Sequence, residues 1–230
     1  MPAEEATMAN TSLIFAGGPE PSNVTLTAIR ALKNIDSVIA ADSGLHTAQK
    51  LNIHVDVVIG DFDSVDETAL ARATSEGSHI IRSSKDKNFS DLEAAIIYAA
   101  DHGATKIVIV TGGGGRLDHQ LGVIAAMFNP KLTKLNVEAL WEETYIYALQ
   151  GPANCEFKTQ IGDTLGLQSW GIFAEQITTT GLRWPLTAET LSNFETRGVS
   201  NQSTSERVSV SLKSGQLLVI HKHSNRQLEK

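Results

Sequence analysis

Residues 55–64 (VDVVIGDFDS) constrain the fold more than any other part of this chain. The stretch begins as a short β-branched apolar run, which is typical of a strand buried on both faces of a parallel sheet. It ends in a glycine followed by two carboxylates, Asp61 and Asp63. Because ligands of open α/β sheets bind outside the carboxyl ends of the strands, these two aspartates lie where a ligand would bind.

The spacing of Asp61 and Asp63 indicates a cation site. In extended backbone, side chains two residues apart point to the same side of the strand. Two like charges held that close repel each other unless a cation lies between them, and Mg²⁺ is a hard cation that often binds together with phosphates. The alternative for an isolated Asp-x-Asp is that Asp61 caps the next helix and Asp63 is solvated.

Strands and helices alternate through the first half of the chain. Strands are predicted over residues 12–18, 37–42, 55–60, 79–83 and 106–111. Capping residues mark the helices between them. Helices are predicted to begin at Ser22, at Ser43-Gly44, and at the Ser64/Glu67 and Ser90/Glu93 capping boxes. Gly103 ends the helix that begins at Ser90, and a last helix is predicted over 118–128. This alternation predicts parallel βαβ units.

The pattern changes past about residue 150. Threonine, serine and glycine increase, and short alternating segments predict strands over 155–158, 164–168, 176–180, 207–212 and 216–221, the last two joined as a hairpin. The predicted fold class is therefore an α/β N-terminal domain, with a mostly parallel sheet and flanking helices, followed by an all-β sandwich C-terminal domain. The domains are expected to span residues 1–150 and 151–230.

The charge and cysteine content exclude several classes of protein. A formal net charge of -7 argues against nonspecific nucleic-acid binding, which needs a basic face. The single cysteine, Cys155, permits no internal disulfide and suits a reducing cytosol. The acidic N-terminus has no apolar core, and no apolar run approaches the ~20 residues that span a bilayer. We expect a cytoplasmic protein without a membrane partner.

Glycines or acids follow most predicted strands of the first half. Glycine lets backbone amides approach a phosphate closely, and amides at helix starts favour anions. No GxxxxGK[ST] or GxGxxG motif is present, so the common nucleotide fingerprints are absent. Several such loops at one sheet edge predict a phosphorylated ligand. The clusters are Gly17-Gly18, Asp42-Ser43-Gly44, Gly60-Asp61-Phe62-Asp63, and Gly112-Gly113-Gly114-Gly115 followed by Arg116.

Charged residues near these loops each have two interpretations. Arg116 would bind phosphate bidentately or pair with Asp118 on the surface. Asp91 would be a third carboxylate of the metal site, an ordinary acid in the first turn of a helix, or both. Lys85 and Lys87 would form a cationic wall for phosphate or a solvated turn.

The second half contains one unusual aromatic segment, in which Trp184 lies between an arginine and a proline. A tryptophan in such a domain is either part of the core or a stacking platform for a flat or cationic ligand. Residues 197–201 read as a turn or loop, and Trp141 and Trp170 are interpreted as packing residues.

Six segments, in order along the chain, resemble motifs of the thiamine pyrophosphokinase family. Two features depart from the family pattern: Ser90 replaces the usual threonine, and residues 87–89 lengthen the third motif. The segments are 41–44 (ADSG), 60–64 (GDFDS, as GDxDS), 85–91 (as KDxTD), 114–119 (GGRLDH, as GGRxDH), and 181–186 with Ser200-Asn201 on the thiamine side.

The resemblance implies an ATP-binding domain and a thiamine-binding sandwich in a homodimer with shared active sites. It implies transfer of the diphosphate of ATP to the hydroxyl of thiamine, with Mg²⁺, releasing AMP. The implied residues are Asp61, Asp63 and Asp91 for metal and catalysis, Arg116 and Asp118 for catalysis, and Gly17, Gly18, Asp42, Ser43, Gly44, Lys85, Lys87, Gly113, Gly114, Gly115 and Arg116 for ATP. Trp184, Ser200 and Asn201 are implied for thiamine.

Two other functions remain open from the residues alone. Residues 61–65 (DFDSV) fit the DxDx[TV] motif of haloacid-dehalogenase-type phosphatases, with Asp61 as nucleophile, but the chain lacks a later acidic pair in a suitable context. A non-catalytic nucleotide sensor would not need three carboxylates at one edge. AMP release from ATP, Mg²⁺ and thiamine separates the three hypotheses.

Overall fold

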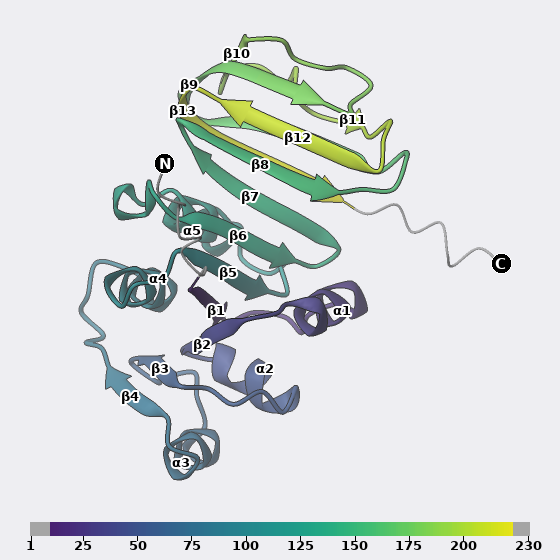
Figure 1. The fold of residues 1–230 in the computed structure, drawn as a ribbon. Coiled ribbons are helices and arrows are strands. Elements are labelled where there is room, and N and C mark those ends of the chain that lie inside the picture. Colours follow the sequence, from purple (N-terminus) through teal and green to yellow (C-terminus); the bar gives the residue numbers. More distant parts are fainter. Residues whose placement is uncertain (1–9, 223–230) are drawn as a thin grey trace, which may run out of the picture.

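The computed structural model describes residues 10–222. Its strands form one 13-stranded mixed sheet in the order β4-β3-β2-β1-β5-β6-β7-β13-β9-β12-β8, with β10 and β11 paired to β9 (Figure 1). Helices accompany only the half that contains β1 to β6, and the other half consists of strands and loops (Figure 1).

The first six strands pair in parallel. The five predicted strands of this half are confirmed. The order places β1 centrally, with β2 to β4 on one side and β5 and β6 on the other, so the chain changes direction along the sheet at β1. The bounds are β1 (Thr11–Phe15), β2 (Ile35–Ala41), β3 (Val57–Gly60), β4 (His79–Arg82), β5 (Lys106–Thr111) and β6 (Asn136–Trp141).

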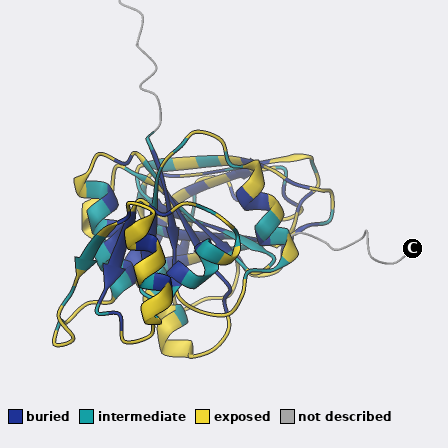
Figure 2. Cartoon of the chain, turned by 90° about the horizontal axis from the view of Figure 1, so that it is seen from below, coloured by how far each residue is buried: buried dark blue, intermediate teal, exposed yellow. Residues whose placement is uncertain are grey.

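Helices cover both faces of this parallel region. Because side chains alternate along a strand, Leu13 and Phe15 of β1 pack on the face that α1, α2 and α3 cover. Ile14 packs on the opposite face, which α4 and α5 cover. The strands are therefore apolar on both faces, as Figure 2 shows by their dark blue colour beneath exposed helices. The helices on the first face are α1 (Asn23–Ala31), α2 (Gly44–Lys50) and α3 (Glu67–Ser75), and those on the second are α4 (Asp91–Asp101) and α5 (Leu117–Met127), followed by the 3-10 helix Pro130–Leu132.

Two predicted helix starts are confirmed as side-chain caps. The Ser22 hydroxyl accepts a hydrogen bond from the backbone N–H of Thr25 at 3.2 Å. The Ser90 hydroxyl accepts one from Glu93 at 3.1 Å. The reciprocal half of this second capping box does not form as predicted, because the Glu93 carboxylate instead accepts from the side chain of Asn129.

The predicted capping box of Ser64 and Glu67 is wrong. The N-cap of α3 is Asp66, whose carboxylate accepts from the backbone N–H of Ala69 at 2.8 Å. The Ser64 hydroxyl donates instead to Asp63. Aspartate caps a helix as well as serine does, and this later start leaves residues 61–64 in the loop after β3.

The second half is all-β within the described residues, and its predicted strands are present. Two predictions need correction: residues 164–168 and 176–180 belong to one strand, β9, and β12 and β13 do not form a hairpin, because β9 pairs between them. A third core cluster lies among these strands. The strands of this half are β8 (Ala153–Lys158), β9 (Thr164–Thr180), β10 (Glu189–Ser192), β11 (Asn201–Gln202), β12 (Arg207–Leu212) and β13 (Ser214–Lys222), and β7 (Thr144–Gln150) precedes them.

The sheet continues across the predicted domain boundary, since β7 pairs antiparallel with both β6 and β13. The division of the chain into domains at residue 150 stays a prediction, and so does the β-sandwich architecture of the second half. No helix within residues 10–222 is long and apolar enough to cross a membrane.

Candidate active site

The loops at the carboxyl ends of the parallel strands line one pocket of about 610 Å³. The glycine loops after β1 and β5 face it from either side of the point where the strand order reverses. This is the position at which open α/β sheets bind ligands. The residues that line the pocket include Gly17, Gly18, Asp42, Ser43, Lys85, Lys87, Asp91, Gly113, Gly114, Gly115, Arg116, Asp118 and Trp141.

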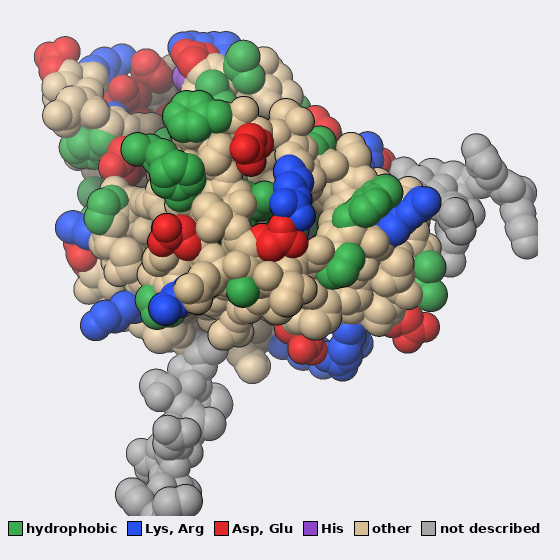
Figure 3. Space-filling view, turned by 90° about the horizontal axis from the view of Figure 1, so that it is seen from above, with side chains coloured by type: hydrophobic (Ala, Val, Ile, Leu, Met, Phe, Trp, Pro, Cys, Tyr) green, Lys and Arg blue, Asp and Glu red, His purple; other side chains and the backbone are tan. Residues whose placement is uncertain are grey.

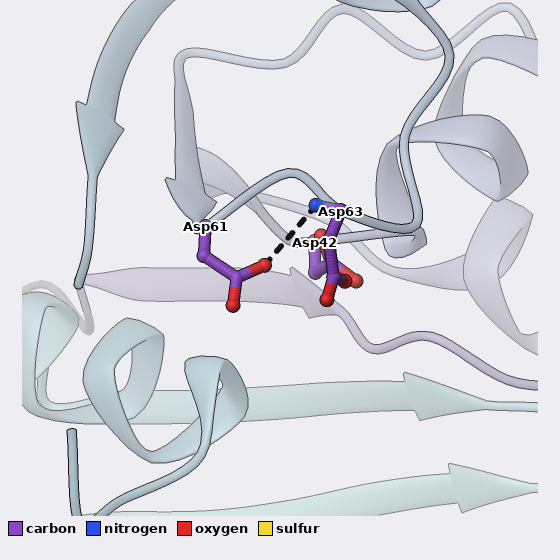
Figure 4. Close-up of side chains that lie close together, drawn as sticks. All are labelled: Asp42, Asp61 and Asp63. Carbon is purple, nitrogen blue, oxygen red and sulfur yellow. Dashed lines mark hydrogen bonds between the residues drawn. The ribbon is translucent and has the colours of Figure 1, made fainter. Parts of the chain in front are cut away.

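Three carboxylates converge near this pocket. Each of Asp42, Asp61 and Asp63 offers an oxygen within 4.8 Å of the oxygens from the other two. Figure 4 shows their side chains approaching one another from the loops that follow β2 and β3. The Asp61 carboxylate also accepts the backbone N–H of Asp63 at 3.1 Å, which closes the turn between them.

The backbone between Asp61 and Asp63 is not extended, so the predicted reason for their convergence is wrong. Phe62 adopts a left-handed conformation with φ of 63°, and a turn brings the two carboxylates together. Gly60 leaves room for the third acid, because a Cβ at this position would lie 3.3 Å from Oδ1 of Asp42.

The protonation of this cluster follows from its surroundings. Burial raises the pKa of Asp42, a backbone hydrogen bond from Ser43 lowers it in part, and Asp91, Asp61 and Asp63 raise it further. The pKa of Asp61 is lowered, first by the backbone N–H of Asp63 and then by nearby lysines. The Asp61 carboxylate, whose lowered pKa favours the ionised form, therefore lies beside Asp42. Burial and the neighbouring acids disfavour the ionised form of Asp42.

The donor set fits a hard divalent cation. Oδ1 of Asp42 is buried and has no hydrogen-bond donor within the described part of the chain. A buried carboxylate oxygen without a partner is costly, and a cation shared with Asp61 and Asp63 would compensate it. Carboxylate oxygens alone suit Mg²⁺ rather than softer metals, which prefer sulfur or imidazole.

Lys85 and Lys87 both lie near the acids, but only Lys87 is enclosed, because Lys85 stands in an exposed turn and its side chain is 66% exposed. Nζ of Lys87 is 3.1 Å from Oδ1 of Asp91 and 4.0 Å from Oδ2 of Asp61, and its side chain is only 10% exposed. Nζ of Lys85 is 3.7 Å from Oδ2 of Asp63. Both ammonium groups offset part of the negative charge of the cluster.

Asp91 lines the pocket, but its carboxylate has other partners. It accepts the hydroxyl of Ser83 at 2.8 Å in addition to its ion pair with Lys87. The three convergent oxygens therefore come from Asp42, Asp61 and Asp63, whereas the sequence pointed to Asp91 as the third metal ligand. A ligand role for Asp91 stays a prediction.

Arg116 and Asp118 form a bidentate pair at the start of α5. Nη2 and Nε of Arg116 donate to the two carboxylate oxygens of Asp118 at 2.5 and 3.1 Å. Both side chains line the pocket and are largely exposed, and the hydrogen bond from Arg116 lowers the pKa of Asp118. The guanidinium is thus charged, oriented and accessible to a ligand.

Trp141 lines the pocket in addition to packing against the core, a role that the sequence did not indicate. It ends β6, and Gly113, with φ of 63°, lies so close that any Cβ there would overlap the indole. Its position at the end of a strand could have marked Trp141 as a pocket residue, because the other pocket loops also follow strands. Trp141 was not recognised in this way, since β6 itself was not predicted.

The predicted thiamine-side residues lie together but outside this pocket. Trp184 is 54% exposed, so it is not a core residue, and the guanidinium of Arg183 stacks over its ring at 4.7 Å. The buried side chain of Asn201 accepts from the Trp184 N–H at 3.2 Å and donates to the Trp184 carbonyl at 2.7 Å. Ser200 beside it is exposed, with φ of 61°.

Family comparisons match both halves of the chain. A model described as the thiamin pyrophosphokinase catalytic domain matches residues 29–139, and one for the thiamin pyrophosphokinase vitamin B1 binding domain matches residues 154–217. Thiamine pyrophosphokinase of Bacillus subtilis is 27% identical over 212 residues, covering 90% of this chain and 96% of that protein. Thiamine pyrophosphokinase 1 of rice is 25% identical, over 67% of this chain and only 61% of the rice protein.

Solved structures share this fold. The structure of Bacillus subtilis thiamine pyrophosphokinase has a TM-score of 0.78 and 25% identity, covering 94% of this chain and all of that one. The thiamin pyrophosphokinase structure from Candida albicans has a TM-score of 0.75 at 15% identity, covering 93% and 89%, which shows the fold alone. Because models of both parts of one family match in order, the chain belongs to the thiamin pyrophosphokinase family.

Proposed function

We propose that this protein transfers the diphosphate group of ATP to the hydroxyl group of thiamine, giving thiamine diphosphate and AMP. The observation that carries the proposal is the convergence of Asp42, Asp61 and Asp63 next to a pocket that Asp42 and the glycine loops line. Family membership supplies the substrates, since one matching model is a catalytic domain and the other a vitamin B1 binding domain.

Asp61 and Asp63, with Asp42 or Asp91, would hold Mg²⁺ in this enzyme. When bound, the ion neutralises phosphate charge and aligns the phosphates. The backbone amides of the glycine loops offer hydrogen bonds to phosphate oxygens, and Lys85 and Lys87 add positive charge at the same edge. Gly17, Gly18, Ser43, Gly44 and Gly113 to Gly115 are the proposed loop contacts for ATP.

In the proposed reaction the hydroxyl oxygen of thiamine attacks the β-phosphorus of ATP. The bond between that phosphorus and the oxygen bridging to the α-phosphate breaks, AMP leaves, and the hydroxyl proton is released. Arg116 can exchange Asp118 for phosphate oxygens, because its planar fork fits either partner, and its charge would stabilise the transferring group. Such transfers depend mainly on positioning and electrostatics.

Thiamine would bind at Trp184, whose exposed ring offers a stacking surface for a flat cation. Asn201 bonds to the Trp184 backbone through its side-chain amide, and Ser200 precedes it in the chain, so both are candidates for polar contacts with thiamine. We take residues 151–230 as the thiamine-binding domain, a β-sandwich, and residues 1–150 as the ATP-binding domain.

A symmetric homodimer would bring the two parts of the site together. Within the described chain, every residue that lines the phosphate-side pocket precedes residue 142, so Trp184 of the same copy takes no part in it. Large exposed side chains of the second half supply apolar surface for a second copy, and Figure 3 shows hydrophobic side chains at the surface of this end. They include Ile172, Phe173, Phe194 and Val199.

The direct test is to mix the protein with ATP, Mg²⁺ and thiamine and to separate the nucleotides and thiamine species by chromatography. We expect AMP and thiamine diphosphate in equal amounts, and neither without thiamine. Inorganic phosphate released without thiamine would identify a phosphatase that uses Asp61. Nucleotide binding without any turnover would identify a sensor. A cytoplasmic location stays an expectation that rests on cysteine content.

A further inference from the structure

The turn between the two acids contains an unusual residue. Phe62 has φ of 63°, a left-handed conformation that bulky side chains rarely adopt and that persists only where the surrounding structure holds it. The ring is 9% exposed and belongs to the core cluster on the face of α1, α2 and α3. Core packing therefore holds one side of this turn.

Arg82 holds the other side. Its Nη1 donates a hydrogen bond to the carbonyl oxygen of Asp61 at 3.2 Å, and its guanidinium lies 4.8 Å from the centre of the Phe62 ring. Arg82 is the last residue of β4, where it pairs with Gly60 of β3, and the following N–H, from Ser83, donates to the Gly60 carbonyl. One side chain thus contacts both residues that set the turn.

We propose that Arg82 is a positioning residue that keeps Asp61 and Asp63 convergent with Asp42. The inference rests on the proposed function only in taking these three acids as the cation site. Without the bond from Arg82, the Asp61 carbonyl loses its side-chain partner and Phe62 loses the cation over its ring, so the turn can relax toward ordinary backbone conformations. The carboxylates would then separate.

The sign of the effect distinguishes positioning from charge. Arg82 is itself positive, so if it acted only through its charge, its removal would make the acids bind a cation more tightly. If Arg82 positions the turn, its removal weakens cation binding instead. The two explanations therefore predict opposite changes in the affinity for the same ion.

The experiment is a titration of the full chain with Mn²⁺ alone, without nucleotide, followed by the electron paramagnetic resonance of free Mn²⁺. Arg82→Met removes the hydrogen bond and the charge but keeps an apolar cover over Phe62. We expect Mn²⁺ binding to weaken by about tenfold, the lower range for groups that orient metal ligands. Arg82→Lys, which retains a donor and the charge, should bind more tightly than Arg82→Met.

Arg72→Met is the matched control, since it also removes an exposed arginine, one that lies on α3 and pairs with Glu76 just after that helix. It should leave Mn²⁺ affinity at or above that of the wild type. Thermal melting checks the fold of each variant, and Phe62→Leu gives a second route that leaves Arg82 unchanged and should also weaken binding. Unchanged or tighter Mn²⁺ binding by folded Arg82→Met and Phe62→Leu overturns the inference.

The failures of the two proposals are distinguishable. A wild-type protein that binds no Mn²⁺ also overturns the role of Arg82, because there is then no cation site to position. A wild-type protein that binds Mn²⁺ but releases no AMP with thiamine refutes the proposed reaction, while the Mn²⁺ titrations still decide the role of Arg82.

Discussion

At the scale of residues, the acid cluster joins side chains from two loops into one site. Asp42 is half-buried, while Asp61 and Asp63 lie in the turn after β3, and each of the three offers an oxygen within 4.8 Å of the other two. Lys85 and Lys87 offset part of the repulsion in the absence of a cation. The two lysines therefore supply only part of the positive charge that the three carboxylates need, and a bound cation would supply the rest.

Asp63→Asn should lower turnover by about a hundredfold or more, because one charge is removed from a group that must stabilise phosphate transfer. The side chain is 52% exposed and the change is nearly isosteric, so the melting temperature should stay close to that of the wild type. Steady-state AMP formation measures the effect. Asp101→Asn, at an exposed pair with Lys131 far along α4 from its N-terminus, is the control. Near-normal turnover of Asp63→Asn would refute its catalytic role.

At the scale of elements, one buried amide binds both backbone polar groups of Trp184, and neighbouring backbone bonds, such as that from Arg183 to Gln202, hold the same segment. Both hydrogen bonds between Asn201 and the Trp184 backbone attach this loop to β11. The exposed indole of Trp184 is therefore attached to a fixed backbone. We expect loss of the indole to affect thiamine binding and loss of the Asn201 amide to affect stability.

Trp184→Ala should raise KM for thiamine by about fivefold or more, corresponding to ~1 kcal/mol of stacking, with KM for ATP nearly unchanged. Its melting temperature should change little, because the ring is 54% exposed. Asn201→Ala leaves backbone groups unsatisfied at a cost of about 2 kcal/mol, which lowers the melting temperature by about 4–8 °C. Kinetics and calorimetry on both variants check this contrast. A large loss of stability in Trp184→Ala would instead make the tryptophan structural.

At the scale of the whole molecule, the phosphate-side pocket and the aromatic platform are separate in one copy. The pocket is lined only from the first 141 residues among those described, and Trp184 lies in the second half. A dimer with two equivalent shared sites resolves this separation and makes subunit mixing informative.

Mixing Asp63→Asn chains with Trp184→Ala chains tests the shared site. If carboxylates and tryptophan come from different copies, each mixed dimer contains one intact site. Equal mixing then gives mixed dimers for half of the molecules, and about a quarter of the wild-type activity at low thiamine. The control is each variant incubated alone under the same exchange conditions. Activity that stays at the average of the two variants would place both groups in one copy.

Much of the architecture was predictable because it depends on local patterns. The five parallel strands were predicted from apolar runs, and Ser22 and Ser90 were recognised as caps because their bonds reach only three residues ahead. Strands β6 and β7 were missed because their two-residue connection, Glu142-Glu143, lacks the Asn-Gly type of signal, although Glu142 has φ of 53°.

Pairing between distant strands was not predictable in the same way. Residues 207–212 and 216–221 resemble a hairpin locally, yet β9 lies between β12 and β13. A strand satisfies its backbone groups equally well with a neighbour in the chain or with a distant one. Tertiary packing against the third core cluster decides between them.

The sequence by itself determined the strand-end chemistry: which loops carry acids, glycines and Arg116, and that they share one sheet edge. Only the tertiary structure decided that Asp42 joins Asp61 and Asp63 while Asp91 pairs with Lys87. The physical reason is that spacing along a chain sets direction only while the backbone stays regular. Here a left-handed Phe62, held by the core and by Arg82 from the next strand, turns the backbone, and only folding brings those contacts together.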